Sequence, residues 1–121
     1  MLAHWIEIPA TDFDRAAKFY ATILDASEPI EDVAGGDVNF GFLSAERGLG
    51  AVCIVRGPGY EPTENGTIVY LSTGDDVAPI MARVEAAGGA VIVPKTSIGD
   101  HGFRAIFRDT EGNRVGLHGP V

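Results

Sequence analysis

Cysteine, basic side chains and long apolar runs are scarce in this chain of 121 residues. Its one cysteine, Cys53, excludes an internal disulfide and a zinc cluster built on several cysteines. Nine basic residues against 17 acidic ones give a net charge of -8, which argues against nucleic acid or an anionic membrane surface as partner. We therefore expect the ligand to be a small molecule.

No apolar run approaches the roughly 20 residues that a membrane-spanning helix needs. The acidic and turn residues Glu7, Pro9 and Asp12 interrupt the N-terminal segment, which argues against a signal peptide. With 45% hydrophobic and 21% charged residues, the chain is expected to form one soluble domain in the cytoplasm.

One pattern occurs twice in the chain. A strand, an amphipathic helix closed by turn residues and several short strands run from Leu2 to Val55, and again from Thr67 to His118. Each copy, on roughly 55 residues, is too small to enclose a core, so the two must pair. We predict an α+β fold of two paired β-α-β-β-β modules forming a curved-sheet cup. One domain would span 1–121, with module one at 1–56, a linker at 57–66 and module two at 67–121.

Two helices are predicted from the spacing of apolar residues. The first is capped by Thr11 or Asp12, and the second is capped by Asp75 or Asp76 and stopped by Gly88-Gly89. The first apolar stripe is Phe13, Ala16, Ala17, Tyr20, Ile23 and Leu24; the second is Val77, Ile80, Met81, Val84 and Ala87.

Alternation of side chains predicts the strands. Val38, Phe40 and Phe42 share one strand face; Phe103, Ala105 and Phe107 share another, opposite Arg104 and Arg108. Further short strands are expected at Leu49–Val55, Ala90–Val93 and Arg114–His118, with a hairpin turn at 99–102.

Several short motifs follow one another in a specific order along nearly the whole chain. They are Glu7-Ile8-Pro9-Ala10-Thr11-Asp12, Arg15-Ala16-Ala17-Lys18-Phe19-Tyr20, Val69-Tyr70-Leu71, Glu85-Ala86-Ala87-Gly88-Gly89, Pro94-Lys95-Thr96 and 109–118. Together they resemble the vicinal oxygen chelate superfamily of glyoxalases, bleomycin-resistance proteins and extradiol dioxygenases, most closely its bacterial glyoxalase-related members that end in Gly-Leu-His. The resemblance implies two modules wrapping a cup, commonly in a homodimer.

The same resemblance implies where a metal would bind. Metal-using members take His and Glu ligands from four strand positions, leaving sites open for two substrate oxygens. Carried over by spacing, these positions fall on Trp5, Val52, Val69 and Gly116, none of which can bind a divalent ion. We therefore expect no inherited metal site and no other cofactor.

Trp5 and Glu7 are two residues apart and so share one face of the first strand, as Gly116 and His118 do on the last. If Trp5 faces the cup, Glu7 can act there as a general base or orient a ligand. The alternative is a solvated rim glutamate, or one paired with an arginine such as Arg104 or Arg114. His118 is either a catalytic or ligand contact, or a strand-end histidine bonded to backbone.

Two functions remain open. The first is a metal-independent protein that binds an apolar or aromatic molecule and sequesters it, as bleomycin-resistance proteins do. Its contacts would come from Trp5, Val69, Phe103, Phe107 and Gly116. The alternative is a lyase or isomerase of glyoxalase ancestry, in which Glu7 moves a proton and His118 assists, or a metal binds at other residues. A purely protein-binding module is disfavoured, because the chain has no tail or long apolar surface segment for partners.

Overall fold

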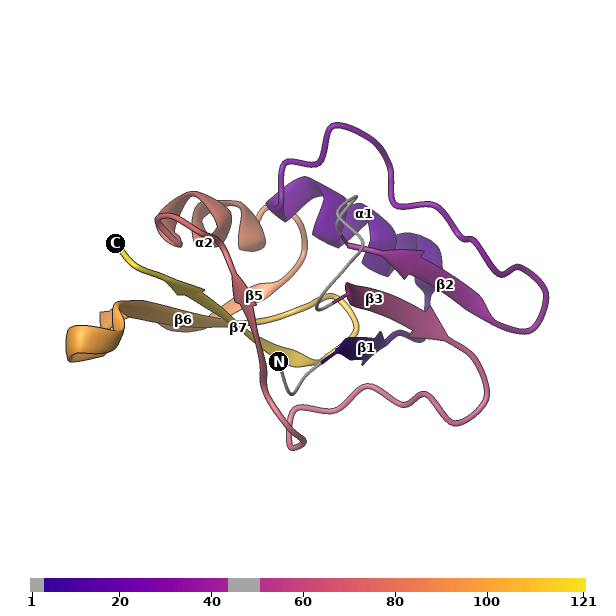
Figure 1. The fold of residues 1–121 in the computed structure, drawn as a ribbon. Helices are drawn as coiled ribbons and strands as arrows, with labels where there is room; N and C mark the ends of the chain where they lie inside the picture. Colours follow the sequence, from indigo (N-terminus) through magenta and orange to yellow (C-terminus); the bar gives the residue numbers. More distant parts are fainter. Residues whose placement is uncertain (1–3, 44–50) are drawn as a thin grey trace.

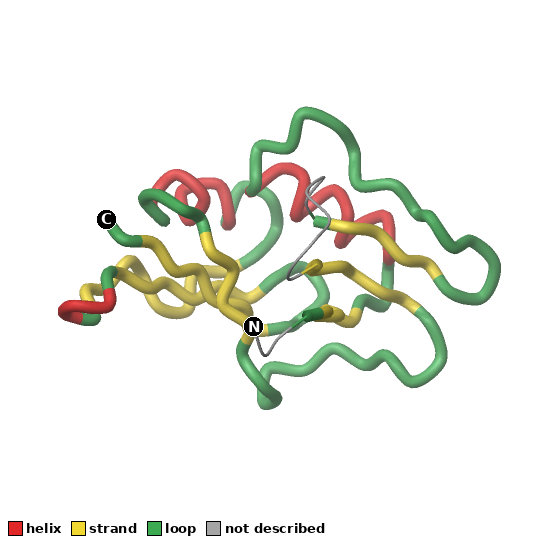
Figure 2. Tube along the Cα trace, viewed as in Figure 1, coloured by secondary structure: helices red, strands yellow, loops and turns green. Residues whose placement is uncertain are grey.

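The computed structural model describes residues 4–43 and 51–121, which form two sheets with the helices on one side of the strands (Figures 1 and 2). The elements, in chain order, are β1 (Trp5–Pro9), α1 (Phe13–Ile23), β2 (Asn39–Phe42), β3 (Ala51–Arg56), β4 (Val69–Ser72), α2 (Ala78–Val84), β5 (Ala90–Ser97), the 3₁₀ turn η1 (Gly99–His101), β6 (Phe103–Arg108) and β7 (Arg114–Gly119). The predicted α+β class is confirmed. The predicted starts of the first pattern at Leu2 and of a strand at Leu49 lie outside the described residues.

The first sheet has the strand order β1-β3-β2, with β1 parallel and β2 antiparallel to β3. Its register places Ile8, Ile54 and Gly41 side by side on an inner face. This face packs against α1 so closely that a Cβ added at Gly41 would lie 2.9 Å from Cζ of Phe13. The opposite, outer face carries Trp5, Glu7, Phe40, Phe42, Ala51, Cys53 and Val55.

The second sheet has the order β4-β7-β6-β5, with β4 parallel and β6 antiparallel to β7. β5 pairs antiparallel with β6 and contains two register shifts. The inner face of β6 and β7 holds four buried apolar residues, Ala105, Phe107, Val115 and Leu117. The outer face of β4, β7 and β6 carries Tyr70, Ser72, Arg114, Gly116, His118, Arg104, Ile106 and Arg108.

The helix caps agree with the prediction for α1 and differ from it for α2. Oδ1 of Asp12 accepts a hydrogen bond from the Arg15 amide at 3.0 Å, as an N-cap does. The N-cap of α2 is Val77, so the prediction of Asp75 or Asp76 at that position is wrong. Asp76 still accepts from the Ala78 amide at 2.9 Å, which explains why an acidic residue occurs just before this helix.

The core joins the two halves of the chain through α1. Phe19 and Tyr20 of α1 contact Phe107 of β6, with ring centroids 5.7 and 6.2 Å apart. The Tyr20 hydroxyl donates to Oδ2 of the buried Asp109 at 2.7 Å. Burial, and then the negative charge of Asp109, raise the pKa of Tyr20 well above its ordinary value, so this phenol stays a hydrogen-bond donor.

A second polar connection lies at the N-terminus of α1. Glu111, in the turn between β6 and β7, accepts hydrogen bonds from the amides of Thr11 at 3.0 Å and Asp12 at 2.9 Å, and from Nε of Arg15 at 2.8 Å. Burial raises the pKa of Glu111, but these donors outweigh it and hold the pKa at about 2, below the usual 4.5. The turn of the second half is thereby fixed to the first helix.

The segment 57–66 forms no helix or strand and runs along the side of the strands away from the helices (Figure 1). It contacts both sheets: the Tyr60 hydroxyl donates to Glu7 at 2.9 Å, and Arg108 donates to Glu64 at 2.7 Å. In the parts of the chain that the structure covers, neither helix has the length and apolar character needed to cross a membrane.

Candidate ligand-binding faces

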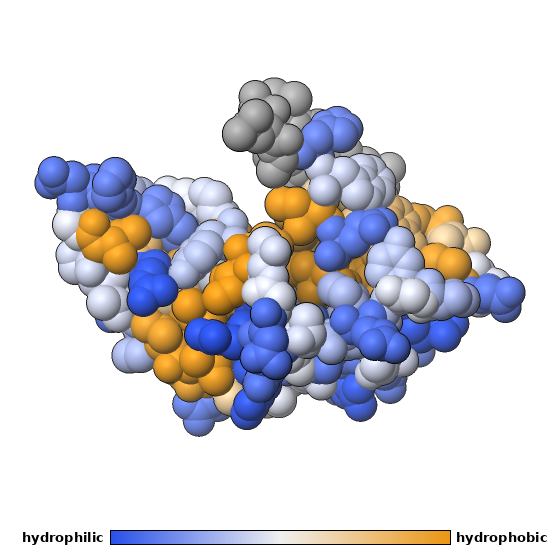
Figure 3. Space-filling view, turned by 90° about the horizontal axis from the view of Figure 1, so that it is seen from below, coloured by the Kyte–Doolittle hydropathy of each residue, from blue (hydrophilic) through white to orange (hydrophobic). Residues whose placement is uncertain are grey.

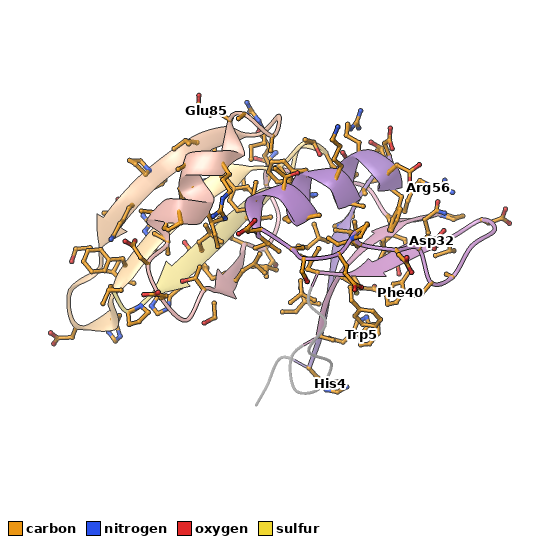
Figure 4. All side chains as sticks on the ribbon, turned by 90° about the horizontal axis from the view of Figure 1, so that it is seen from above. His4, Trp5, Asp32, Phe40, Arg56 and Glu85 are labelled. Carbon is orange, nitrogen blue, oxygen red and sulfur yellow. The ribbon has the colours of Figure 1, made fainter. Side chains whose placement is uncertain are left out.

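Three aromatic rings lie together on the outer face of the first sheet. β1 and β2 lie on either side of β3, and their register directs Trp5, Phe40 and Phe42 to this same face. The indole of Trp5 stacks on Phe40 with ring centroids 5.5 Å apart and planes 5° apart. Phe42 meets Trp5 edge-on at 5.6 Å and Phe40 at 4.9 Å. We call Trp5, Phe40 and Phe42 the aromatic platform. Trp5 is 47% exposed, and Figure 4 shows it beside Phe40 at the end of the first sheet.

Glu7 lies next to the platform and is held by two donors. Its Oε2 accepts from Nε1 of Trp5 at 3.3 Å, and its Oε1 accepts from the Tyr60 hydroxyl at 2.9 Å. The hydrogen bond to Glu7 is the main reason why the pKa of Tyr60 lies above its ordinary value. In the described residues no ion pair includes Glu7, and a carboxylate has about four acceptor positions, so two remain for a ligand donor.

Cys53 lies beneath this group and is unsuited to nucleophilic catalysis. Its thiol is fully buried and donates to the Ile6 carbonyl at 3.3 Å. Burial, followed by the negative charge of Glu7, raises the pKa of Cys53 to about 11. The thiol is therefore protonated at neutral pH, as expected for a core cysteine.

The outer face of the second sheet presents a different arrangement, centred on Tyr70. The Tyr70 ring lies across Gly116 of the neighbouring strand, where an added Cβ would sit 2.4 Å from two ring carbons. Nη1 of Arg104, two strands from Tyr70, donates to the Tyr70 hydroxyl at 3.1 Å. Tyr70 remains 41% exposed although its ring covers the neighbouring strand.

A cavity of about 950 Å³ lies between the two sheets, beside the segment that follows α1. The first sheet contributes Ile6, Phe42 and Val52, and β4 contributes Tyr70, Leu71 and Ser72. Figure 3 shows the surface hollowed between two lobes, with hydrophobic residues along the hollow. The aromatic platform touches this cavity only through Phe42, so the chain has two adjoining but distinct surfaces.

The predicted site residues are divided among these surfaces. Trp5 and Glu7 lie together on the first outer face, whereas Gly116 and His118 lie on the second. Nε2 of His118 contacts the His101 carbonyl at 2.5 Å, the strand-end arrangement that the sequence left as an alternative. His118 and Glu7 lie on different sheets, and among the described residues no hydrogen bond or ion pair joins them.

Three predicted contacts face the inner side of the second sheet. Phe107 is fully buried against α1, so it is not available to a ligand on the outer face. Val69 is the register partner of Val115, so its side chain also points to the inner face of the sheet. Phe103 has the same parity as Phe107, and Nζ of Lys95 lies 4.7 Å from its ring centroid. The strand periodicity that predicted an aromatic row is correct, but these side chains belong to the core side.

Sequence reasoning did not select Tyr60, Tyr70 or Arg104 as site residues. Tyr60 lies in a segment without periodicity, so no pattern connects it with Glu7. The alternation of Arg104 with Phe103 and Ala105 did indicate an outward arginine, but its contact with Tyr70 depends on a ring crossing an intervening strand.

The positions inherited for a metal do not carry suitable ligands. Trp5 and Gly116 lie on the outer faces, whereas Val52 and Val69 lie on the inner faces, so the four predicted positions do not share one side of the sheets. The outer-face residues in register with Trp5 and Gly116 are Ala51 and Tyr70. The Tyr70 ring fills the space into which a side chain at position 116 would project. Across the described ranges, no three His, Cys, Asp or Glu side chains are grouped closely enough to hold a metal ion. Within 4–43 and 51–121, the residues at these positions therefore do not fit a divalent metal.

The fold agrees with a comparison to known families. The family model described as the Glyoxalase/Bleomycin resistance protein/Dioxygenase superfamily matches residues 2–117. The chain therefore belongs to this superfamily, and the resemblance seen in the sequence is confirmed.

Individual relatives are more distant. Proteins named "Putative glyoxylase CFP32" from Mycobacterium bovis and Mycobacterium tuberculosis are 28% identical over 116 residues, covering 94% of this chain. The chain spans only 44% of the length of these curated relatives.

Solved structures support the fold. A glyoxalase/bleomycin resistance protein from Albidiferax ferrireducens T118 has a TM-score of 0.75 at 18% identity, with 98% of both chains covered. One from Streptomyces sp. CB03234 has a TM-score of 0.68 at 24% identity, covering 96% of this chain and 98% of that one. A glyoxalase I mutant from Zea mays has a TM-score of 0.69 at 19% identity, covering 97% of this chain and 46% of that one.

Proposed function

We propose that this chain is a metal-independent, small-molecule-binding member of its superfamily, and that its ligand is a planar apolar or aromatic compound that stacks on the aromatic platform. The observation that carries the proposal is the exposed Trp5 indole, backed by Phe40 and adjacent to Glu7. A ring backed by a second ring keeps its orientation, so little side-chain freedom is lost when a ligand covers it.

Glu7 supplies polar specificity in this proposal. Its carboxylate is oriented by Trp5 and Tyr60 but is not neutralised by a cation among the described residues. A ligand with an N–H or O–H group at the edge of its ring can donate to the remaining acceptor positions. The platform provides the apolar contact and Glu7 selects ligands that carry a donor.

Metal independence is supported by the residues at the inherited positions. Trp5 and Tyr70 are aromatic, Gly116 has no side chain, and the only thiol nearby is the buried, protonated Cys53. Binding therefore depends on stacking and hydrogen bonds rather than on substrate oxygens chelated to an ion.

An enzymatic role is the second candidate, because an unneutralised carboxylate beside a binding surface can accept a proton. In that case Glu7 is the general base, and the reaction class is the lyase or isomerase chemistry expected from glyoxalase ancestry. His118 contributes less to this candidate, since its Nε2 contacts the His101 carbonyl on the other sheet.

Thermal-shift screening of planar compounds, with protein stripped of metal by EDTA, tests the proposal. Trp5→Ala should weaken binding of a hit by roughly 1 to 3 kcal/mol through lost apolar contact. Ile92→Ala, which truncates an exposed side chain on the edge strand β5, is the matched control and should leave the affinity unchanged.

Glu7→Gln separates the two candidates because it preserves shape but removes the base. A binding protein loses modest affinity, whereas an enzyme that binds the same compound loses turnover. Wild-type affinity in both Trp5→Ala and Glu7→Gln contradicts the assignment of the site to this face.

A further inference from the structure

Hydrogen-bond donors line up across the outer face of the second sheet. The register places Ser72, His118 and Arg104 side by side on β4, β7 and β6. Tyr70 belongs to the adjacent row, but its ring crosses Gly116 and brings its hydroxyl to Arg104 at 3.1 Å. Four side chains that can donate hydrogen bonds thus surround one area of the sheet.

The Tyr70–Arg104 contact has a defined direction. Because Arg104 donates to the Tyr70 oxygen, the hydroxyl hydrogen of Tyr70 points elsewhere and is free to be donated. Arg104 has further N–H groups beyond the one used, and a guanidinium presents them in a planar fork. A phenol and a guanidinium held together in this way match the two oxygens of a carboxylate.

Only one of the three arginines on this face forms an ion pair within the described residues. Arg108 pairs with Glu64, but no ion pair within 4–43 and 51–121 includes Arg104 or Arg114. Nε of Arg114 is buried and has no hydrogen-bond partner among the described residues. The outer positions of β4, β7 and β6 contain no Asp or Glu, although the chain as a whole has a net charge of -8.

A cavity lined by apolar and polar residues adjoins the donors, and Glu28 and Glu31 of the segment after α1 belong to its lining. Tyr70 and Ser72 line the cavity of about 950 Å³ together with Ile6, Val52 and Leu71. A molecule with its charged group at Tyr70 and Arg104 can therefore place an apolar part between the two sheets.

We propose that Tyr70 and Arg104 bind the carboxylate of an otherwise apolar small acid, whose hydrocarbon part occupies the cavity between the sheets. Tyr70 donates its hydroxyl hydrogen to one carboxylate oxygen, and Arg104 donates to the other. Ser72 and His118 border the same area. This site uses neither Trp5 nor Glu7, so it goes beyond the proposed function and can stand or fail without it.

Isothermal titration with 4-phenylbutyrate and its neutral analogue 4-phenylbutanamide tests this site. The carboxylate should bind about tenfold or more tightly than the amide, since a charge-assisted hydrogen bond is lost in the amide. Arg104→Gln should remove this difference, and Tyr70→Phe should reduce it about threefold or more. Arg108→Gln changes an arginine on the same strand face that is already paired with Glu64, so it should leave the difference intact.

Ile92→Ala, which truncates an exposed side chain on β5, serves as a second control and should bind 4-phenylbutyrate as the wild-type protein does. If Arg104→Gln does not fold, Arg104→Lys keeps the charge without the planar fork and should lose part of the preference for the carboxylate. Equal binding of acid and amide, absence of binding by either, or an unchanged preference in the Arg104 variant overturns the proposal. Tighter binding of phenyl phosphate than of 4-phenylbutyrate overturns the assignment of the anion as a carboxylate.

Discussion

At the scale of single residues, Gly116 allows the Tyr70 ring to lie across the outer face of the second sheet. In a strand, glycine is ordinarily a weak choice, because it packs no side chain and loses more backbone freedom than alanine. Here the missing Cβ is the space that the Tyr70 ring occupies. The Tyr70 ring thus occupies the position into which any side chain at residue 116 would project.

Gly116→Ala is therefore expected to destabilise the protein by about 1 to 3 kcal/mol, through overlap with Tyr70. The measurement is urea denaturation of the single variants and of the double variant with Tyr70→Ala. In the Tyr70→Ala background the cost of Gly116→Ala should fall below about 0.5 kcal/mol, because the overlapping ring is absent. An equal cost in both backgrounds contradicts the packing described.

Glu111 gives a prediction for the effect of pH on stability. Its folded-state pKa of about 2 lies below the usual 4.5, so the stabilisation it provides is present above pH 4.5 and is lost as the pH falls from 4.5 toward 2. Glu111→Gln should lower the free energy of unfolding at pH 7 by about 2 kcal/mol, since charged hydrogen bonds to Arg15 and two amides are weakened.

The measurement for Glu111 is the free energy of unfolding of both proteins from pH 7 to pH 2. The difference between wild type and Glu111→Gln should shrink below pH 4.5. A difference that stays constant across this range contradicts the role assigned to the Glu111 carboxylate.

Sequence alone could place Trp5 and Glu7 on one face, because alternation along one strand needs no knowledge of the rest of the fold. It could not place Val69 and Phe107 correctly relative to a ligand, since strand parity shows which residues share a face but not which face α1 covers. Contacts made through long side chains, such as Tyr60 to Glu7 and Arg104 to Tyr70, depend on tertiary structure and have no sequence signal.

At the scale of elements, α1 connects the two halves of the chain. Its apolar residues reach the first sheet, its Tyr20 contacts Asp109, and its N-terminus is bound by Glu111. The helix was predictable from a strong cap and a regular apolar stripe. The second helix is shorter, and β5 longer, than the pattern predicted. β5 continues to pair with β6 as far as Ser97, with two register shifts that the apolar pattern does not indicate.

Asp12→Ala should destabilise the protein by about 1 kcal/mol by removing the cap of α1. Asp14→Ala, in the first turn of the same helix, removes a similar charge without the capping hydrogen bond and is the matched control. Thermal denaturation of the two variants compares them directly. Equal melting temperatures contradict the importance of the Asp12 cap.

At the scale of the whole molecule, the fold was predictable because the chain repeats one pattern, and a half alone cannot enclose a core. The relation between the sheets was not predictable. Trp5 and the second-sheet residues were expected to line one cup, whereas the structure presents the aromatic platform and the cavity beside β4 as separate surfaces.

We expect a homodimer in solution. Among the described strands, β1, β2, β4 and β5 each pair on one side only, and open edges can be covered by a second copy of the chain. Light scattering at micromolar concentration should report twice the chain mass of 12.7 kDa. A persistent monomer contradicts this expectation.

The central claim, that the chain binds a planar small molecule on Trp5 without a metal, is most directly tested by Trp5 fluorescence. Trp5 is the only tryptophan in the chain, so its emission reports on the platform alone. A stacking ligand, titrated into protein held in EDTA, should change this emission saturably with one site per chain, and added nickel or zinc should leave the affinity unchanged. A planar ligand without a carboxylate that binds with no change in Trp5 emission, or only when a divalent metal is added, would contradict the account.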